Sequence, residues 1–129
     1  MRSNTVLMLL LAVASTVHAQ AKPQTLAHVF RLGNNLQREC SGFNSSSFTT
    51  HEDGTVDILP TYAGCFEYIL GVSDDIQMGS KDVVCLPAGV IASSVVLVVT
   101  KYIDAHPEGL HKSAVVIVRK ALSSAFPCR

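Results

Sequence analysis

The sequence of 129 residues has no charge surplus, no tryptophan and no apolar run long enough to cross a membrane. Ten Lys and Arg residues balance ten Asp and Glu residues, so no basic surface for nucleic acid is indicated. The two most apolar stretches, Val6–Ala14 and Val90–Val99, are both shorter than the ~20 residues that a membrane helix needs. The length allows one domain, which excludes a multidomain enzyme.

Patterns typical of catalytic and metal sites are also missing. His106 and His111 are five residues apart, so they would lie on different faces of a helix, unlike the two histidines of the H-E-x-x-H metalloprotease pattern. The serines at 45–47 lack the glycines of a nucleophile elbow, and no glycine-rich phosphate loop follows a strand. We therefore expect no catalytic residues, no metal and no cofactor, and a protein that binds a partner instead of an enzyme.

The first segment that is present is a predicted export signal. Arg2 precedes the nine apolar residues Val6–Ala14, and Val17-His18-Ala19 is a small-residue pattern that signal peptidase accepts. We predict a signal peptide over residues 1–19 and one mature domain over 20–129. Loss of Arg2 leaves nine basic and ten acidic residues, and we expect no membrane insertion of the mature chain.

The four cysteines all lie in the mature chain. An even number of cysteines in an exported protein favours two disulfides. Their separations of 25, 20 and 43 residues exclude the closely spaced pairs of a zinc site.

Apolar residues recur at helical spacing in four segments. The four segments are Thr25–Cys40, Pro60–Ile76, Val90–Ile103 and the segment from Pro107 to about Ala125. In the first, Gly33 lies on the apolar face, where we expect another backbone to approach closely. The third is rich in β-branched residues, which also favour a strand, but its spacing and the lack of an evident partner strand favour a helix.

These segments predict an all-α fold, a small antiparallel bundle of about four helices. If the helices alternate in direction, Cys40 and Cys65 lie at one end of the bundle, and Cys85 and Cys128 at the other. We therefore predict the disulfides Cys40–Cys65 and Cys85–Cys128. Each would stabilise the fold by about 3–5 kcal/mol by restricting the unfolded chain.

Residues 41–58 show no regular period, and Asp53-Gly54 indicates a turn. A stretch of this length is either flexible or a contact surface. Candidate partner-binding residues in it are the aromatic Phe48 and the carboxylates Glu52, Asp53 and Asp57, although a solvated loop fits equally well.

Asp74 and Asp75 are further candidates for partner contacts. As adjacent residues on a helix they diverge, so they do not form an acid–base pair. A second hypothesis concerns the valines of the third helix, which could line a cavity for an apolar small molecule in a secreted carrier. Such a stripe is more often part of the core or of a dimer interface.

Five groups of residues, which together span Phe30 to Cys128, resemble the Rap/Tai family. They are Phe30-x-x-Gly33-Asn34-x-Leu36-x-x-x-Cys40, Cys65-x-x-Tyr68-Ile69-x-Gly71-Val72-x-Asp74, Cys85-Leu86-Pro87-x-Gly89-Val90, Val98-Val99-x-Lys101-Tyr102-Ile103-x-x-His106-Pro107-Glu108 with His111, and Ala121-Leu122-x-x-Ala125-Phe126-Pro127-Cys128.

The resemblance implies a small, helical, periplasmic immunity protein of a Gram-negative bacterium, often a homodimer. It further implies neutralisation of a type VI secretion effector, a peptidoglycan-cleaving amidase, by occlusion of its active site. The chain departs from the family in two places. Glu67 stands where a glycine is usual, and residues 43–58 match no family pattern.

Overall fold

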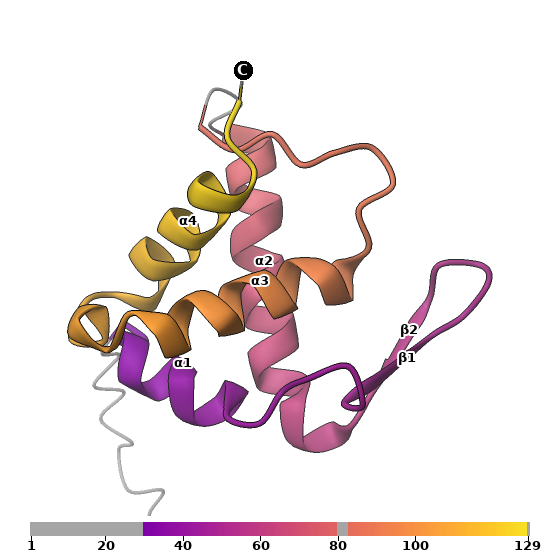
Figure 1. Ribbon diagram of the computed structural model, residues 1–129, viewed down its shortest axis with the longest axis horizontal. Helices are drawn as coiled ribbons and strands as arrows, with labels where there is room; N and C mark the ends of the chain where they lie inside the picture. Colours follow the sequence, from indigo (N-terminus) through magenta and orange to yellow (C-terminus); the bar gives the residue numbers. More distant parts are fainter. Residues whose placement is uncertain (1–29, 80–82, 129) are drawn as a thin grey trace, which may run out of the picture.

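The computed structural model describes residues 30–79 and 83–128, so the predicted signal peptide lies outside the described residues. Helices dominate the fold, and a small hairpin projects from them (Figure 1). In chain order the elements are α1 (Gly33–Cys40), β1 (Phe48–Thr50), β2 (Val56–Ile58), the 3₁₀ turn η1 (Pro60–Tyr62), α2 (Ala63–Gly79), α3 (Ala92–Ala105), the 3₁₀ turn η2 (Pro107–Gly109) and α4 (Ala114–Ala125).

The start of α1 is tied to the segment that precedes α4. The backbone amide of Gly33 donates to the carbonyl oxygen of Lys112 at 2.9 Å, and Leu32 pairs with Ser113 in an isolated antiparallel bridge. A Cβ on Gly33 would lie 2.9 Å from the carbonyl oxygen of Leu110, so the close backbone approach predicted at Gly33 is confirmed. The helix predicted to begin at Thr25 does not include residues 30–32, because the backbone of this segment pairs with the chain before α4.

Residues 41–58 contain an antiparallel hairpin, so the prediction of a purely α-helical fold is wrong. Phe48 pairs with Ile58, Thr49 with Asp57 and Thr50 with Val56. Phe48, Val56 and Ile58 pack against the core, whereas Thr49 and Asp57 are exposed. Strands of three residues are too short for this alternation to stand out in a sequence.

The predicted second and third helices are confirmed, with shifted ends. Pro60 starts the turn η1, and α2 then continues to Gly79. The third segment forms the helix α3, as its spacing predicts, and buries Val96, Val99 and Ile103 on one face.

The fourth helix begins later than predicted. Pro107 starts the short turn η2, and α4 begins only at Ala114. The carbonyl oxygen of Leu110 accepts a hydrogen bond from the amide of Asn34, and the amide of Ala114 donates to the carbonyl oxygen of Arg31. The segment before α4 is therefore held by the start of α1 and does not continue as a helix.

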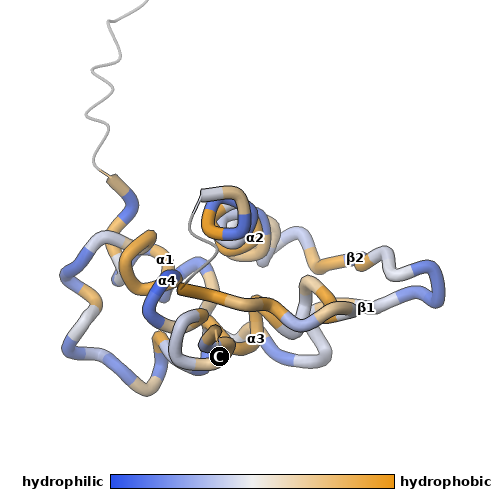
Figure 2. Tube along the Cα trace, turned by 90° about the horizontal axis from the view of Figure 1, so that it is seen from above, coloured by the Kyte–Doolittle hydropathy of each residue, from blue (hydrophilic) through white to orange (hydrophobic). Residues whose placement is uncertain are grey.

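The helices do not form the predicted antiparallel bundle, because α3 runs across α2 (Figure 1). The view from above agrees, since α2 is seen along its axis while α3 lies across the picture (Figure 2). Only short connections force neighbouring helices to be antiparallel. The connection between α2 and α3, which includes residues 83–91, is long enough to let α3 turn. All four helices bury side chains in one core, whose most buried large members are Leu36, Ile69, Ile76, Val96, Val99, Ile103, Val118 and Leu122.

Two disulfides join the helix ends in the expected pairs. Cys40–Cys65 links the end of α1 to the first turn of α2 and is buried. Cys85–Cys128 links the connection before α3 to the chain after α4 and is more exposed. The amide of Cys85 also donates to the carbonyl oxygen of Phe126 at 2.9 Å. The predicted cysteine pairs are correct although the predicted antiparallel bundle is wrong, because the pairing depends only on which helix ends lie close together.

Candidate functional site

An aromatic cluster attaches the hairpin to the helices. The buried ring of Phe43 lies 5.7 Å from the ring of Phe48, between ring centroids, and 5.4 Å from that of Tyr62, which it meets edge to face. The ring of Phe66 in α2 lies 6.3 Å away. Because aromatic pairs of this geometry add to the stability from burial, the base of the hairpin is firmly placed. Phe48, predicted as a partner anchor, is half-buried in this cluster and supports the strand.

The turn of the hairpin is closed around Asp53. One carboxylate oxygen of Asp53, Oδ1, accepts hydrogen bonds from the amide of Thr55 at 2.9 Å and from its hydroxyl at 2.7 Å. These bonds lower the pKa of Asp53 below its ordinary value of 3.8, the hydroxyl having the larger effect. Gly54 has a φ of +85°, which an L side chain rarely adopts. The predicted Asp53-Gly54 turn is therefore confirmed, and its carboxylate is ionised at neutral pH.

Residues 51–57, here called the acidic tip, project beyond the helices. The tip is coloured as hydrophilic at the far end of the hairpin (Figure 2). The carboxylates of Glu52, Asp53 and Asp57 are all exposed there. Asp57 pairs with His51 across the hairpin at 2.8 Å. The structure thus brings together three of the predicted contact residues on one narrow, negatively charged protrusion.

Asp74 and Asp75 lie elsewhere on the molecule. Both are exposed on α2, and Asp75 pairs with Arg119 of α4 at 3.6 Å. At a rise of 1.5 Å per residue, Asp75 is about 18 Å along α2 from Ala63, near which the hairpin joins the helix. The structure does not bring this pair to the acidic tip, and a partner that touched both would have to span α2.

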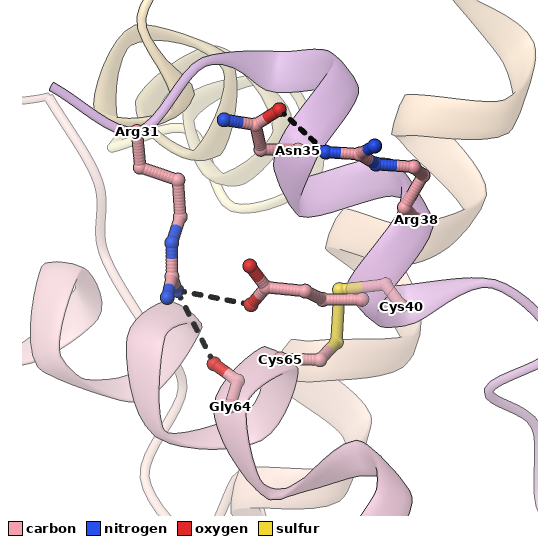
Figure 3. A network of polar contacts seen from close by, with 7 residues as sticks. Arg31, Asn35, Arg38, Cys40, Gly64 and Cys65 are labelled. Carbon is pink, nitrogen blue, oxygen red and sulfur yellow. Dashed lines mark hydrogen bonds and ion pairs between the residues drawn. A yellow bond between two sulfur atoms is a disulfide. The ribbon is translucent and has the colours of Figure 1, made fainter. Parts of the chain in front are cut away.

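A surface hollow of about 550 Å³ lies beside α1, and the sequence patterns did not reveal it. Its lining includes Phe30, Arg31, Asn35, Arg38, Glu39 and Tyr68. Arg31 contacts Glu39 and the carbonyl oxygen of Gly64, and Arg38 contacts Asn35 (Figure 3). The only signal in the sequence is the Asn-x-x-Arg spacing on the polar face of α1. Phe30, Arg31 and Glu39 are close to these two residues in the chain, but Tyr68 comes from α2, and Ser113 and Val115 from the start of α4.

The valine stripe of α3 is part of the core. Val95, Val96 and Val99 are buried and pack in the main apolar cluster, so the interpretation of this stripe as core is confirmed. No group of three His, Cys, Asp or Glu side chains that could hold a metal ion occurs within residues 30–79 and 83–128. In the same part of the chain, the helices are too short or too polar to span a membrane.

Fold and surface together define a small, disulfide-bonded helical protein that exposes an acidic hairpin. The chain belongs to the family of Rap1a immunity proteins, whose sequence model matches residues 32–128. The resemblance read from the cysteines and helix-end motifs is thereby confirmed. Membership indicates an immunity protein that binds a cognate effector, a role that does not require catalysis. No curated protein and no solved structure gives a significant match.

Proposed function

We propose that this protein is a periplasmic immunity protein that neutralises a peptidoglycan-cleaving amidase delivered by type VI secretion. It binds the amidase and occludes its active-site groove. The observation that carries this proposal is the acidic tip, since a narrow hairpin on a rigid aromatic base has a shape that can enter a groove (Figures 1 and 2). Two disulfides support the location, because such bonds persist in oxidising compartments such as the periplasm.

In this role Glu52, Asp53 and Asp57 face basic groups of the amidase, and Phe48 holds the strand behind them. Asp74 and Asp75 provide a separate contact on α2. A stable complex buries about 800 Å² on each partner, more than a hairpin tip provides, so other elements must also contribute. We further propose that the protein is a homodimer, as the sequence resemblance implies.

The role is tested by growth rescue. Cells that export the cognate amidase, which we expect a neighbouring gene to encode, should stop growing, and co-expression of this protein should restore growth. Failure to rescue against this and any other amidase effector of the same strain would contradict the proposed role. Native mass spectrometry distinguishes this role from the second hypothesis, a secreted carrier of an apolar small molecule. A co-purifying apolar small molecule would support the carrier, whereas a dimer without a bound molecule would support the inhibitor.

The acidic tip is tested by charge reversal. Glu52→Lys combined with Asp53→Lys should weaken amidase binding by at least about tenfold, because complementary charges are replaced by repulsive ones. Asp104→Lys combined with Glu108→Lys is the matched control, since both residues are exposed acids outside the tip. Binding is measured by titration calorimetry. Equal affinity of the two double variants would exclude the tip from the interface.

A further inference from the structure

The hollow beside α1 has one fixed, neutralised arginine. Nη1 of Arg31 lies 3.3 Å from a carboxylate oxygen of Glu39 and donates to the carbonyl oxygen of Gly64 at 3.4 Å. The guanidinium of Arg31 also lies over the ring of Tyr68, 4.5 Å from its centroid. Glu39 therefore balances the charge of Arg31 (Figure 3), and Arg31 forms part of the lining of the hollow.

Arg38 is the cation of the hollow that has no carboxylate partner. One guanidinium nitrogen, Nη2, donates to the side-chain oxygen of Asn35 at 3.0 Å, one turn earlier on α1. No ion pair to Arg38 occurs in the described part of the chain, and Arg38 is exposed. The bond orients both side chains and leaves the amide group of Asn35 and the remaining Arg38 nitrogens as donors.

The remaining walls supply another donor and apolar surface. Burial raises the pKa of Tyr68 above its ordinary value of 10.0, so its hydroxyl is protonated at neutral pH. Phe30 is 80% exposed at the rim, and Val115 lies in the lining beside it. Among the described residues that line the hollow, Glu39 is the only carboxylate, and Arg31 engages it. The hollow thus offers more donors than acceptors, together with apolar walls.

We propose that this hollow binds an acidic peptide segment, with one carboxylate held by Arg38 and Asn35. An arginine fork and an adjacent amide suit the two oxygens of a carboxylate. A single unbalanced cation beside Glu39 favours a singly charged anion over a phosphate dianion. The volume of about 550 Å³ lies in the range of small-ligand sites, and the rings of Phe30 and Tyr68 can cover apolar atoms of the peptide.

In the complex, this segment belongs to the effector, and only that assignment rests on the proposed function. The hollow is lined by residues of α1 and of the start of α4, among others. These two segments lie away from the hairpin (Figure 1). The hollow therefore adds the second contact region that an interface of standard size requires. The acidic tip and the hollow have opposite charge, so together they would fix the orientation of the bound effector.

The test uses the purified mature chain and a defined probe, so it does not depend on any effector. The probe is the capped peptide acetyl-Glu-Phe-Glu-amide, and its control replaces both glutamates with glutamine. Binding is followed by NMR through the side-chain amide resonances of Asn35. The acidic peptide should shift these resonances in a saturable manner, and the glutamine peptide should bind at least about tenfold more weakly.

The variant Arg38→Gln should weaken binding of the acidic peptide by about tenfold or more. Lys101→Gln is the matched control, because it removes one exposed positive charge from α3, outside the hollow, and should change affinity by less than about twofold. No saturable shift at Asn35, equal binding of both peptides, or equal effects of the two substitutions would each overturn the proposal. Growth rescue would be unaffected by that outcome, so the two proposals fail separately.

Discussion

At the scale of single residues, Gly33 is the position where packing leaves no room for a side chain. Gly33→Ala should lower the free energy of unfolding by about 1–3 kcal/mol, because the new Cβ would press on the backbone of Leu110 and the side chain of Ile117. Gly71→Ala is the control, since a Cβ there meets nothing within 4 Å. It should raise the free energy of unfolding by up to about 1 kcal/mol through helix propensity. Urea titration measures both, and effects of the same sign would contradict the packing described for α1.

Ser93 is the second residue with an unusual environment. Its hydroxyl is fully buried in the first turn of α3 and has no hydrogen-bond partner among the described residues. Ser93→Ala should therefore raise the free energy of unfolding by about 1 kcal/mol, because an unpaired buried hydroxyl is destabilising.

The neighbouring substitution Ser94→Ala makes the same change at a half-buried position of the same turn. It should change the free energy of unfolding by less than about 0.5 kcal/mol. The midpoint of urea unfolding should move for Ser93→Ala without a change in slope. A lower midpoint for Ser93→Ala would mean that the hydroxyl is paired in solution.

At the scale of elements, the hairpin depends on an ionised Asp53. The pKa of Asp53 is lower in the folded protein than its ordinary value of 3.8. The ionised carboxylate therefore stabilises the turn fully at a pH above 3.8, and this stabilisation is lost as the pH falls through the folded pKa. The amide resonance of Thr55 should therefore titrate with a midpoint below 3.8 in an NMR pH series. Asp53→Asn should abolish this transition. A midpoint at or above the ordinary value would contradict the hydrogen bonds of the turn.

Local sequence patterns predicted some elements well and others poorly. The helical spacing of Val95, Val99 and Ile103 was sufficient to predict α3, despite the strand preference of valine. The hairpin was not predicted beyond its turn, because its three-residue strands are stabilised by packing on the core, as in the contact between Phe48 and Phe43, and not by a local pattern. Pro107 does start a helical turn, the 3₁₀ turn η2, but not the predicted long helix. The hydrogen bonds between the start of α1 and residues 110–114 end this turn at Gly109.

At the scale of the whole molecule, the two disulfides link different parts of the fold and differ in their exposure to solvent. Mild reduction followed by alkylation should label Cys85 and Cys128 before Cys40 and Cys65, because Cys40 and Cys65 are buried in the core. Peptide mass spectrometry measures the order. Simultaneous labelling of all four cysteines would show that the core opens as readily as the chain end.

Opening of each disulfide should also lower stability by an amount set by the loop it closes. The loops of 25 and 43 residues correspond to about 3.5 and 4 kcal/mol in the chain-entropy description. Replacement of Cys40 and Cys65 by alanine should cost more than this entropic value, because both side chains also fill the core. The paired variant Cys85→Ala with Cys128→Ala is the comparison, measured by urea unfolding. A loss below about 3.5 kcal/mol for the Cys40 and Cys65 variant would contradict the place of this pair in the core.

The sequence alone predicts the four helical segments, the turn at Asp53-Gly54, the family and the cysteine pairs. These follow from the spacing and chemistry of residues close together in the chain, and from which helix ends can meet. Three features arise only when the chain packs: α3 crosses α2, residues 48–58 form a hairpin, and Arg38 and Tyr68 line one hollow. Such features depend on side chains from distant segments that compete for the same core, and no local pattern records which of them pack together.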